Sequence, residues 1–476
     1  MSSALNLTFG VLRWFGLSFL LPIAVALYYR ESVWPFVVPA LLSFSLGWIG
    51  ERLTRPADSL TPREGFLVVA VAWLSVAAVG AVPYLLDQHT WVDALFESMS
   101  GFTTTGATVL TDIEAEPKGL LMWRQFTQWL GGMGIIVLAL AVLPKLSVGG
   151  RQLMETEAPG PQVDQLTPHL YQTARLLWKV YLGLTVAEAA LLWWEGMSLF
   201  DSVAHALTTM ATGGFSPHAD SLAGFGAPIQ WTVAAFMLIA GTSFALLYRV
   251  GSGRPRELAR NAEFRFYLTV VVLAGVTLAL MLPGPLEARL RHGLFQAASV
   301  VTTTGFASAD FNLWGTALQF ALLLLMFFGG CAGSTGGGVK VVRVLLAFKY
   351  LWREVRKAVH PSAVIPIRLG RRVVDEGALG GVVAFVILYM TTFAVGSFLL
   401  LLDAQLEGPP LSVLEGVAVA ASALGNVGPG FGAAGPMGSY AGFSDFSKEL
   451  LVLLMWAGRL ELFPALVLLT RGYWRR

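Results

Sequence analysis

Residues 95–106 read LFESMSGFTTTG, and residues 294–305 read LFQAASVVTTTG. The two stretches match at seven of twelve positions in register, and each lies between two long uncharged runs. Such an internal repeat is typical of a fold built from copies of one unit. Shorter versions occur between other uncharged runs, at 211–215 (ATGGF) and 425–429 (GNVGP). The sequence therefore predicts four related loop segments.

A small hydroxyl side chain sets the register of the four copies. It stands six residues before the last glycine of each copy, as Ser100, Thr208, Ser299 and Ser422. This spacing favours Gly214 over Gly213 as the key glycine of the second copy. The fourth copy has Gly-Asn-Val where the first and third have three threonines. It therefore lacks the threonine hydroxyls of those copies, and its side-chain oxygens cannot take the same role.

The composition places the chain in a membrane. Of its 476 residues 55% are AVILMFWYC and only 13% are charged, with a formal net charge of +2, whereas soluble domains carry about 25% charge. A water-soluble enzyme, a disordered protein and a basic nucleic-acid binder are all disfavoured. The single cysteine, Cys331, excludes an intramolecular disulfide framework, and the six histidines are scattered rather than spaced as metal ligands.

Ten runs are apolar enough to cross a bilayer, for which about 20 residues are needed. They are 14–29, 32–50, 65–86, 125–144, 180–194, 227–248, 266–286, 311–339, 377–402 and 450–470. With both termini inside, 25 of the 32 Lys and Arg lie in cytoplasmic segments and 6 outside. The positive-inside rule favours this orientation. The basic segment 340–372 is then interpreted as a topogenic loop that faces lipid headgroups, with a nucleic-acid or partner patch as the alternative.

The predicted fold is an all-α polytopic membrane protein with ten transmembrane helices. The last eight spans form four pseudo-repeated helix, pore-loop and helix units around a central pore, and two extra helices precede them. The predicted boundaries are 1–60 for the two N-terminal helices, 61–150, 151–255 and 256–372 for pore units 1 to 3, and 373–476 for pore unit 4.

The loop segments are predicted to form a cation filter. Each begins with about ten apolar or small residues, too short to cross a bilayer, and continues into Gly- and Thr-rich chain that cannot stay helical. Irregular backbone at membrane depth is tolerated only where it lines water or is buried in protein. Four segments on one axis would present carbonyl oxygens that replace an ion's hydration shell. The hydroxyls of residues 103–105 and 302–304 could either hold the loop or add oxygen ligands. Close helix packing by Thr and Gly is the alternative.

Residues 329–338, GGCAGSTGGG, interrupt the run 311–339. They are too rich in glycine to remain helical, so the span is predicted to break there. A phosphate-binding loop would need GxxxxGK[ST], but Val339 separates Gly338 from Lys340. We interpret the break as a hinge or lid inside an ion pathway, with close helix packing as the alternative.

Arg459 lies in the otherwise apolar last run. Since a charge inside a membrane is costly, Arg459 is expected to face a protein interior or an aqueous cavity, either beside the ion path or in an ion pair with another span. Glu461 is not its partner along one helix, because residues two apart project to different faces. Glu188, also within a span, is given no role.

These motifs resemble the Trk-type potassium-uptake membrane subunits, relatives of the Ktr and plant high-affinity potassium transporters. The resemblance runs from the first span to the last. The motifs on which it rests are SGFTTTGAT (100–108), GGMGIIVLALAVLP (131–144), ATGGFSPH (211–218), TTTGF (302–306), GSTGGGVKVVR (333–343), GNVGPGFG (425–432) and GRLELFP (458–464).

The resemblance implies potassium (K⁺) uptake through one central pore, with one filter glycine per unit. The implied ion-binding residues are Thr103, Thr104, Thr105, Gly106, Ala211, Thr212, Gly213, Gly214, Thr302, Thr303, Thr304, Gly305, Gly425, Asn426, Val427 and Gly428. The implied gate is Gly333, Ser334, Thr335, Gly336, Gly337, Gly338, Lys340 and Arg459. A glycine at the first filter position resembles the potassium-favouring members, whereas many sodium-favouring plant relatives have serine.

The resemblance also implies a homodimer in a bacterial inner membrane, with both termini cytoplasmic. Each protomer would have its own pore and dock on a cytosolic, TrkA-like regulatory ring that binds nucleotides. The sequence has no Rossmann-like segment, so nucleotide control is expected only through that partner. No nucleic-acid partner or enzymatic activity is expected. The alternatives are a cation-coupled secondary transporter of another solute and a sodium-permeable relative.

Overall fold

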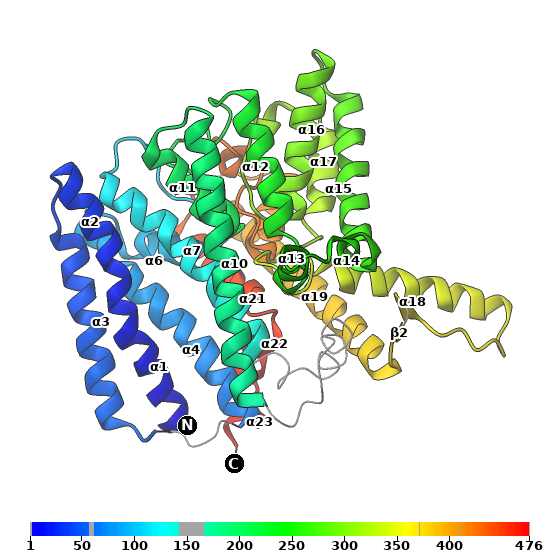
Figure 1. Ribbon diagram of the computed structural model, residues 1–476, viewed down its shortest axis with the longest axis horizontal. Coiled ribbons are helices and arrows are strands. Elements are labelled where there is room, and N and C mark those ends of the chain that lie inside the picture. Colours follow the sequence, from blue (N-terminus) through cyan, green and yellow to red (C-terminus); the bar gives the residue numbers. More distant parts are fainter. Residues whose placement is uncertain (1, 57–60, 142–165, 371, 409, 476) are drawn as a thin grey trace.

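The computed structural model describes residues 2–56, 61–141, 166–370, 372–408 and 410–475, which are mostly helical. Both chain ends lie at the same end of the molecule (Figure 1). Among the described residues, six helices are long and apolar enough to cross a membrane, or eight if two bent pairs each count as one span. A helical multi-span membrane protein is therefore confirmed, and the total of ten spans stays a prediction.

The N-terminal helices form a closely packed hairpin. It comprises α1 (Ser2–Phe15), the 3₁₀ turn η1 (Gly16–Phe19), α2 (Leu20–Tyr29) and α3 (Trp34–Leu53). A Cβ on Gly47 would collide with the backbone of Arg13, and one on Gly50 with the ring of Phe9. These two glycines therefore let α3 approach α1 closely.

Beyond α3 the same pattern of helices occurs four times. A long helix is followed by a short helix of 12 to 16 residues and, after a loop, by a further helix. The short helices are α6 (Trp91–Phe102), α11 (Leu199–Met210), α16 (Leu286–Val301) and α20 (Val413–Gly425). The helices before them are α4 (Pro62–Gly80) with α5 (Val82–Leu86), α10 (Leu166–Trp194), α15 (Ala262–Met281) and α19 (Glu376–Leu406).

The helices after the short ones are less regular. They are α7 (Lys118–Ala141), α12 (Ala227–Ala240) with α13 (Phe244–Gly251), α17 (Thr316–Leu325), and α21 (Asp445–Arg459) with α22 (Phe463–Leu469). The remaining elements are α14 (Pro255–Arg260), η2 (Phe311–Leu313), α18 (Val341–Val359), β1 (Arg368–Leu369), β2 (Arg372–Val373), η3 (Gly432–Ala434) and α23 (Arg471–Trp474). Strands β1 and β2 pair antiparallel, with Arg368 opposite Val373.

Three of the predicted spans are broken or bent. The chain turns by 106° between α12 and α13 and by 117° between α21 and α22. At the second bend Glu461 and Leu462 both have positive φ. The break predicted at residues 329–338 is confirmed, but it begins earlier: helix α17 ends at Leu325, and no helix resumes until Val341.

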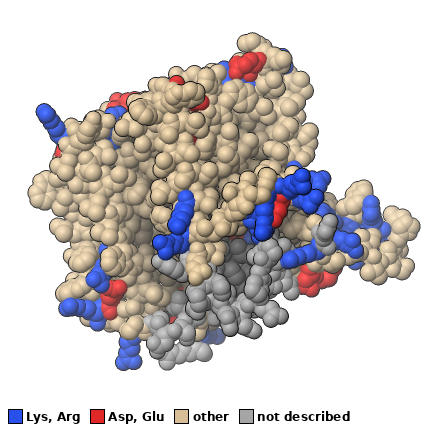
Figure 2. Space-filling model, viewed as in Figure 1, with Lys and Arg blue, Asp and Glu red and all other residues tan. Residues whose placement is uncertain are grey.

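The surface suits a lipid environment. Large apolar side chains stand exposed on the outer helices, among them Leu273 and Leu280 on α15 at 64% and 71%. Figure 2 shows uncharged residues over most of the visible face, with lysine and arginine gathered around α14 and α18. The C-terminal parts of the short helices lie in the interior instead, and α6 is buried from Phe96 to Phe102. The segments that follow the short helices are therefore held inside the protein.

Candidate functional site

The four short helices end in the same turn. The backbone N–H of Thr105, Gly213, Thr304 or Val427 donates to the carbonyl of Ser100, Thr208, Ser299 or Ser422, respectively, at 2.8 to 2.9 Å. Such a bond closes a helix at a left-handed residue. The left-handed residues are Thr104, Thr212, Thr303 and Asn426, with φ of 52° to 58°. The hydroxyl residues that align the four copies in the sequence thus occupy equivalent places.

These turns hold strained backbone. A left-handed conformation is common for asparagine and glycine but unusual for threonine, whose Cβ is branched, and such strain costs about 1–3 kcal/mol per residue. Two residues further on, a glycine again has positive φ in every copy: Gly106, Gly214, Gly305 and Gly428, at 75° to 107°. The same left-handed pattern at four equivalent places, strained at the three threonines, indicates a functional constraint.

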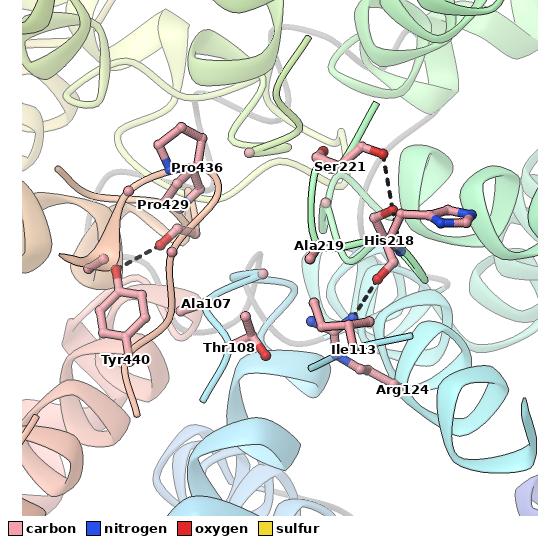
Figure 3. Close-up of a pocket in the computed structure, with 18 residues that line it drawn as sticks. Ala107, Thr108, Ile113, Arg124, His218, Ala219, Ser221, Pro429, Pro436 and Tyr440 are labelled. Atoms are coloured by element: carbon pink, nitrogen blue, oxygen red, sulfur yellow. Dashed lines mark hydrogen bonds between the residues drawn. The ribbon is translucent and has the colours of Figure 1, made fainter. Parts of the chain in front are cut away.

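These four glycines, which we name the glycine ring, lie against one another's segments in a closed cycle. A Cβ added to Gly106, Gly214, Gly305 or Gly428 would collide with the carbonyl oxygen of Gly213, Thr304, Val427 or Thr105, respectively. Each glycine therefore meets the next copy, and the fourth copy returns to the first. All four line one opening, around which Figure 3 shows residues of the first, second and fourth copies.

The threonine hydroxyls of the first and third copies hold their own segments. Thr103 shares a 2.7 Å hydrogen bond with Thr105, and Thr302 shares one of the same length with Thr304. These bonds favour the loop-holding role over the ligand role, two roles that the sequence leaves open.

In the second and fourth copies, other side chains hold the segments. Gln128 on α7 donates through Nε2 to the carbonyl of Gly213 at 2.7 Å and accepts from the N–H of Phe215. Asn426 donates through Nδ2 to the Thr105 hydroxyl at 3.0 Å and so bridges the fourth copy to the first. Gln128 was missed from the sequence, because it lies outside the repeat.

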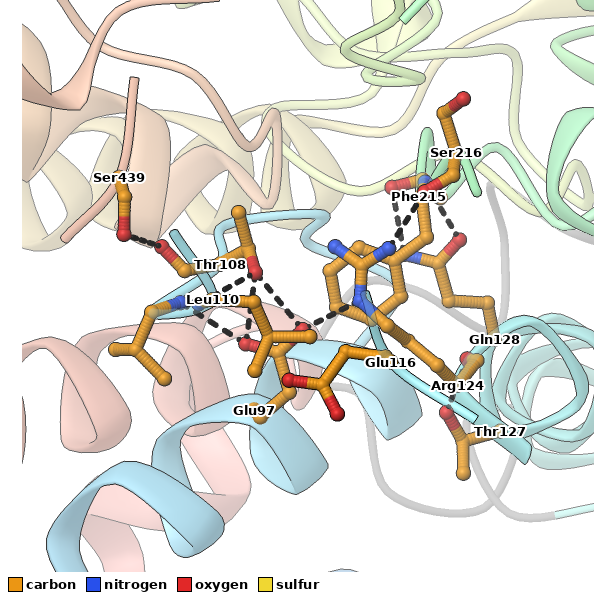
Figure 4. A network of polar contacts seen from close by, with 12 residues as sticks. Glu97, Thr108, Leu110, Glu116, Arg124, Thr127, Gln128, Phe215, Ser216 and Ser439 are labelled. Carbon is orange, nitrogen blue, oxygen red and sulfur yellow. Dashed lines mark hydrogen bonds and ion pairs between the residues drawn. The ribbon is translucent and has the colours of Figure 1, made fainter. Parts of the chain in front are cut away.

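A buried ion pair supports the outer side of the first two copies (Figure 4). The Glu97 carboxylate accepts from Arg124 Nε at 2.5 Å, and from the Thr108 hydroxyl and the Val109 N–H at 3.0 Å. Arg124 also donates to the Ser216 carbonyl at 2.7 Å. The pair thus joins the segment after Gly106 to the segment after Gly214. The one sequence signal was that Glu97 stands where the third copy has Gln296.

The glycine-rich segment 333–338 packs against the other side of the ring, where the short helices end. The N–H of Gly337 donates to the Thr303 hydroxyl at 2.7 Å. The Thr335 hydroxyl is placed to donate to the carbonyls of Met210 and Ala240, at 3.0 and 3.3 Å. Residues 334–340 are buried, so this segment covers the ring from within the protein.

Arg459 and Lys340 both bind this segment. Arg459, 2% exposed, donates to the carbonyls of Thr335 at 2.9 Å and Gly131 at 3.1 Å. Lys340 Nζ donates to the carbonyl of Gly336. Glu461 instead pairs with Arg343 at 2.5 Å. The protein-interior position expected for Arg459 is observed, and its hydrogen bonds go to backbone carbonyls.

Five of the predicted filter residues lie at the helix ends. Gly425 is the last residue of α20, and the C-cap residues of α6, α11, α16 and α20 are Thr103, Ala211, Thr302 and Asn426. The other eleven lie in the turns that carry the ring. Glu188 is buried on α10, with Thr209 of α11 beside its carboxyl group.

The fold and this site define a class: a multi-span helical membrane protein in which four strained backbone segments meet around one opening. The TrkH family model, described as a cation transport protein, matches residues 50–472. The chain belongs to this family. It is a family of transporters, not of enzymes.

The relatives match over nearly their whole length. The Trk system potassium uptake protein TrkH of Salmonella typhimurium is 40% identical, with 97% of this chain and 96% of that protein covered. The protein of the same name from Escherichia coli is 39% identical with the same coverage. The crystal structure of the potassium transporter TrkH from Vibrio parahaemolyticus is similar with a TM-score of 0.91, 34% identity and coverage of 100% and 99%.

Replacing Glu97 by glutamine is expected to destabilise the protein by about 3–5 kcal/mol, because the buried Arg124 loses its counter-charge. The measurement is the thermal unfolding midpoint of purified protein in detergent. Glu449→Gln, at an exposed glutamate on α21, is the control and should leave the midpoint unchanged. If the Glu97→Gln variant unfolds at the same midpoint as the wild type, the pair of Glu97 and Arg124 does not support the fold.

Proposed function

We propose that this chain takes up potassium across the bacterial inner membrane, as the membrane subunit of a Trk-type system. The observation that carries the proposal is the glycine ring, four backbone segments in cyclic contact. Family membership and the names of the relatives support K⁺ as the transported ion. No covalently bound cofactor is part of the proposal.

Selection is by main-chain oxygens of segments 103–106, 211–214, 302–305 and 425–428. Carbonyl oxygens replace the hydration shell of an alkali ion, and conduction requires that binding be weak enough for release. The four segments contain no ionisable side chain, which favours such moderate binding. The hydrogen bonds of Thr103, Thr302, Gln128 and Asn426 hold the left-handed backbone in place before an ion arrives.

The gate is the glycine-rich segment 333–338 with Lys340 and Arg459. It covers the ring from the side of the short helices. Its anchors include the Thr335 hydroxyl, the Gly337 N–H, the guanidinium of Arg459 and Lys340 Nζ, and the Phe244 N–H donates to the Gly333 carbonyl at 3.0 Å. Releasing these contacts opens the path. A segment with four glycines among six residues can change backbone conformation at little steric cost.

The assembly follows the family resemblance. The chain has ten spans, two N-terminal helices and four pore units with boundaries near 61, 151, 256 and 373, and both termini in the cytoplasm. It forms a homodimer that docks on a cytosolic nucleotide-binding ring. The positive-inside distribution supports the orientation, and the described residues contain one two-stranded sheet rather than a nucleotide-binding fold.

Gly305→Ser is expected to lower potassium flux at least tenfold, because the new Cβ meets the Val427 carbonyl and φ is +84°. The measurement is uptake of radiolabelled rubidium by proteoliposomes. Gly253→Ser is the matched control: its φ is +85°, and nothing lies within 4 Å of its Cβ. If both variants keep wild-type flux, the ring is not the filter.

Thr335→Val is expected to raise ion leak through the closed protein about five- to tenfold. The change keeps the side-chain shape but removes the hydroxyl that anchors the glycine-rich segment, and a hydrogen bond of this kind contributes about 1 kcal/mol. Single-channel recording or liposome leak without the regulatory partner measures it. Ser334→Ala is the control, since no described group bonds the Ser334 hydroxyl. If both variants leak equally, the glycine-rich segment is not the gate.

A further inference from the structure

Three potential metal ligands lie together in the loops between α5 and α7. Asp87 and His89 belong to the turn between α5 and α6, and Glu116 precedes α7. One imidazole nitrogen and two carboxylate oxygens, one from each residue, lie within 4.8 Å of one another. No local sequence pattern indicates this group, because Glu116 is 27 residues from His89.

The backbone on both sides of this group is fixed. In the turn, the amide of Asp87 donates to the Pro83 carbonyl and that of His89 to the Tyr84 carbonyl, at 3.2 and 3.1 Å. Gln88 between them has φ of +71°. On the other segment, the Glu31 carboxylate accepts from the N–H groups of Lys118 and Gly119. The three side chains therefore meet without a rearrangement of either segment.

The charges of the group are poorly balanced. His89 Nε2 lies 3.6 Å from Glu116 Oε1, so one imidazole faces two carboxyl groups. Of the surrounding charges, Glu31 and Glu97 add to the negative field, and Arg124 opposes it. A divalent cation would supply the missing positive charge.

We propose that Asp87, His89 and Glu116 form a binding site for a divalent cation of the zinc class. Zinc accepts nitrogen and carboxylate ligands in a tetrahedron, and a site with three protein ligands leaves the fourth position to water. Bonds of about 2.1 Å place tetrahedral ligand atoms about 3.4 Å apart, so the side chains need to close by little more than 1 Å. Magnesium and calcium prefer shells made of oxygen alone, which the imidazole disfavours.

The site opens to the outside and adjoins the path of the ion. An opening of about 500 Å³ is lined by all three residues together with Val109, Leu110 and Asp112. The same loop, through Ala107, Thr108 and Ile113, lines the opening over the glycine ring. Figure 4 shows Glu116 beside the pair of Glu97 and Arg124 that supports the ring. A bound cation would thus join the α5–α6 turn to the segment before α7.

The test is zinc binding by the full-length protein in lipid nanodiscs after treatment with a chelator. Titration calorimetry at pH 7.5 should show one zinc per chain, and His89→Gln and Glu116→Gln should each weaken its Kd at least tenfold. Asp112→Asn, a carboxylate of the same opening, and His218→Gln, a histidine at the other opening, should leave it within twofold. An absence of saturable binding, or His89→Gln with wild-type affinity, would overturn the proposal.

A second measurement does not depend on the folding of any variant. Zinc K-edge absorption of the wild-type complex should show one imidazole nitrogen with oxygen neighbours at about 2.0–2.2 Å. A shell with two or more imidazoles would place the metal at another site, and a shell of oxygen alone would remove His89 from the ligands. Both results would contradict the proposal, and neither depends on potassium transport.

Discussion

The whole structure depends on the backbone-to-backbone contact between four glycines and the carbonyls of the next copy. Because only glycine fits against those oxygens, the segments come close enough to close a ring in the protein interior. The contact is sequential, from the first copy to the second, third, fourth and back. Displacing one copy would therefore open the ring at two places.

Strained, polar backbone at this depth needs support on all sides, since an unbonded buried polar group costs about 1–3 kcal/mol. The support differs between copies: threonine pairs in the first and third, Gln128 in the second and Asn426 in the fourth. Around the ring, Tyr440 donates to the Gly428 carbonyl at 2.9 Å, and the pair of Glu97 and Arg124 joins the first two copies. A near-symmetric ring is thus held by an asymmetric shell, as expected when the four copies belong to one chain.

The sequence predicted the parts of the structure that repeat or that violate the membrane pattern. The register of the four copies, the break at the glycine-rich segment and the interior position of Arg459 all follow from local spacing or from the cost of polar groups in lipid. The supporting residues could not be found in that way. Gln128 contacts Gly213 across 85 residues, and the group of Asp87, His89 and Glu116 joins two loops. Such long-range contacts depend on how the helices pack, which no local pattern encodes.

The central claim is that an alkali ion passes through the glycine ring. The most direct measurement is the anomalous scattering of rubidium in crystals of this protein grown in rubidium salt. We expect a peak within the ring formed by Gly106, Gly214, Gly305 and Gly428, surrounded by main-chain oxygens. Rubidium peaks elsewhere in the protein but none inside the ring would contradict it.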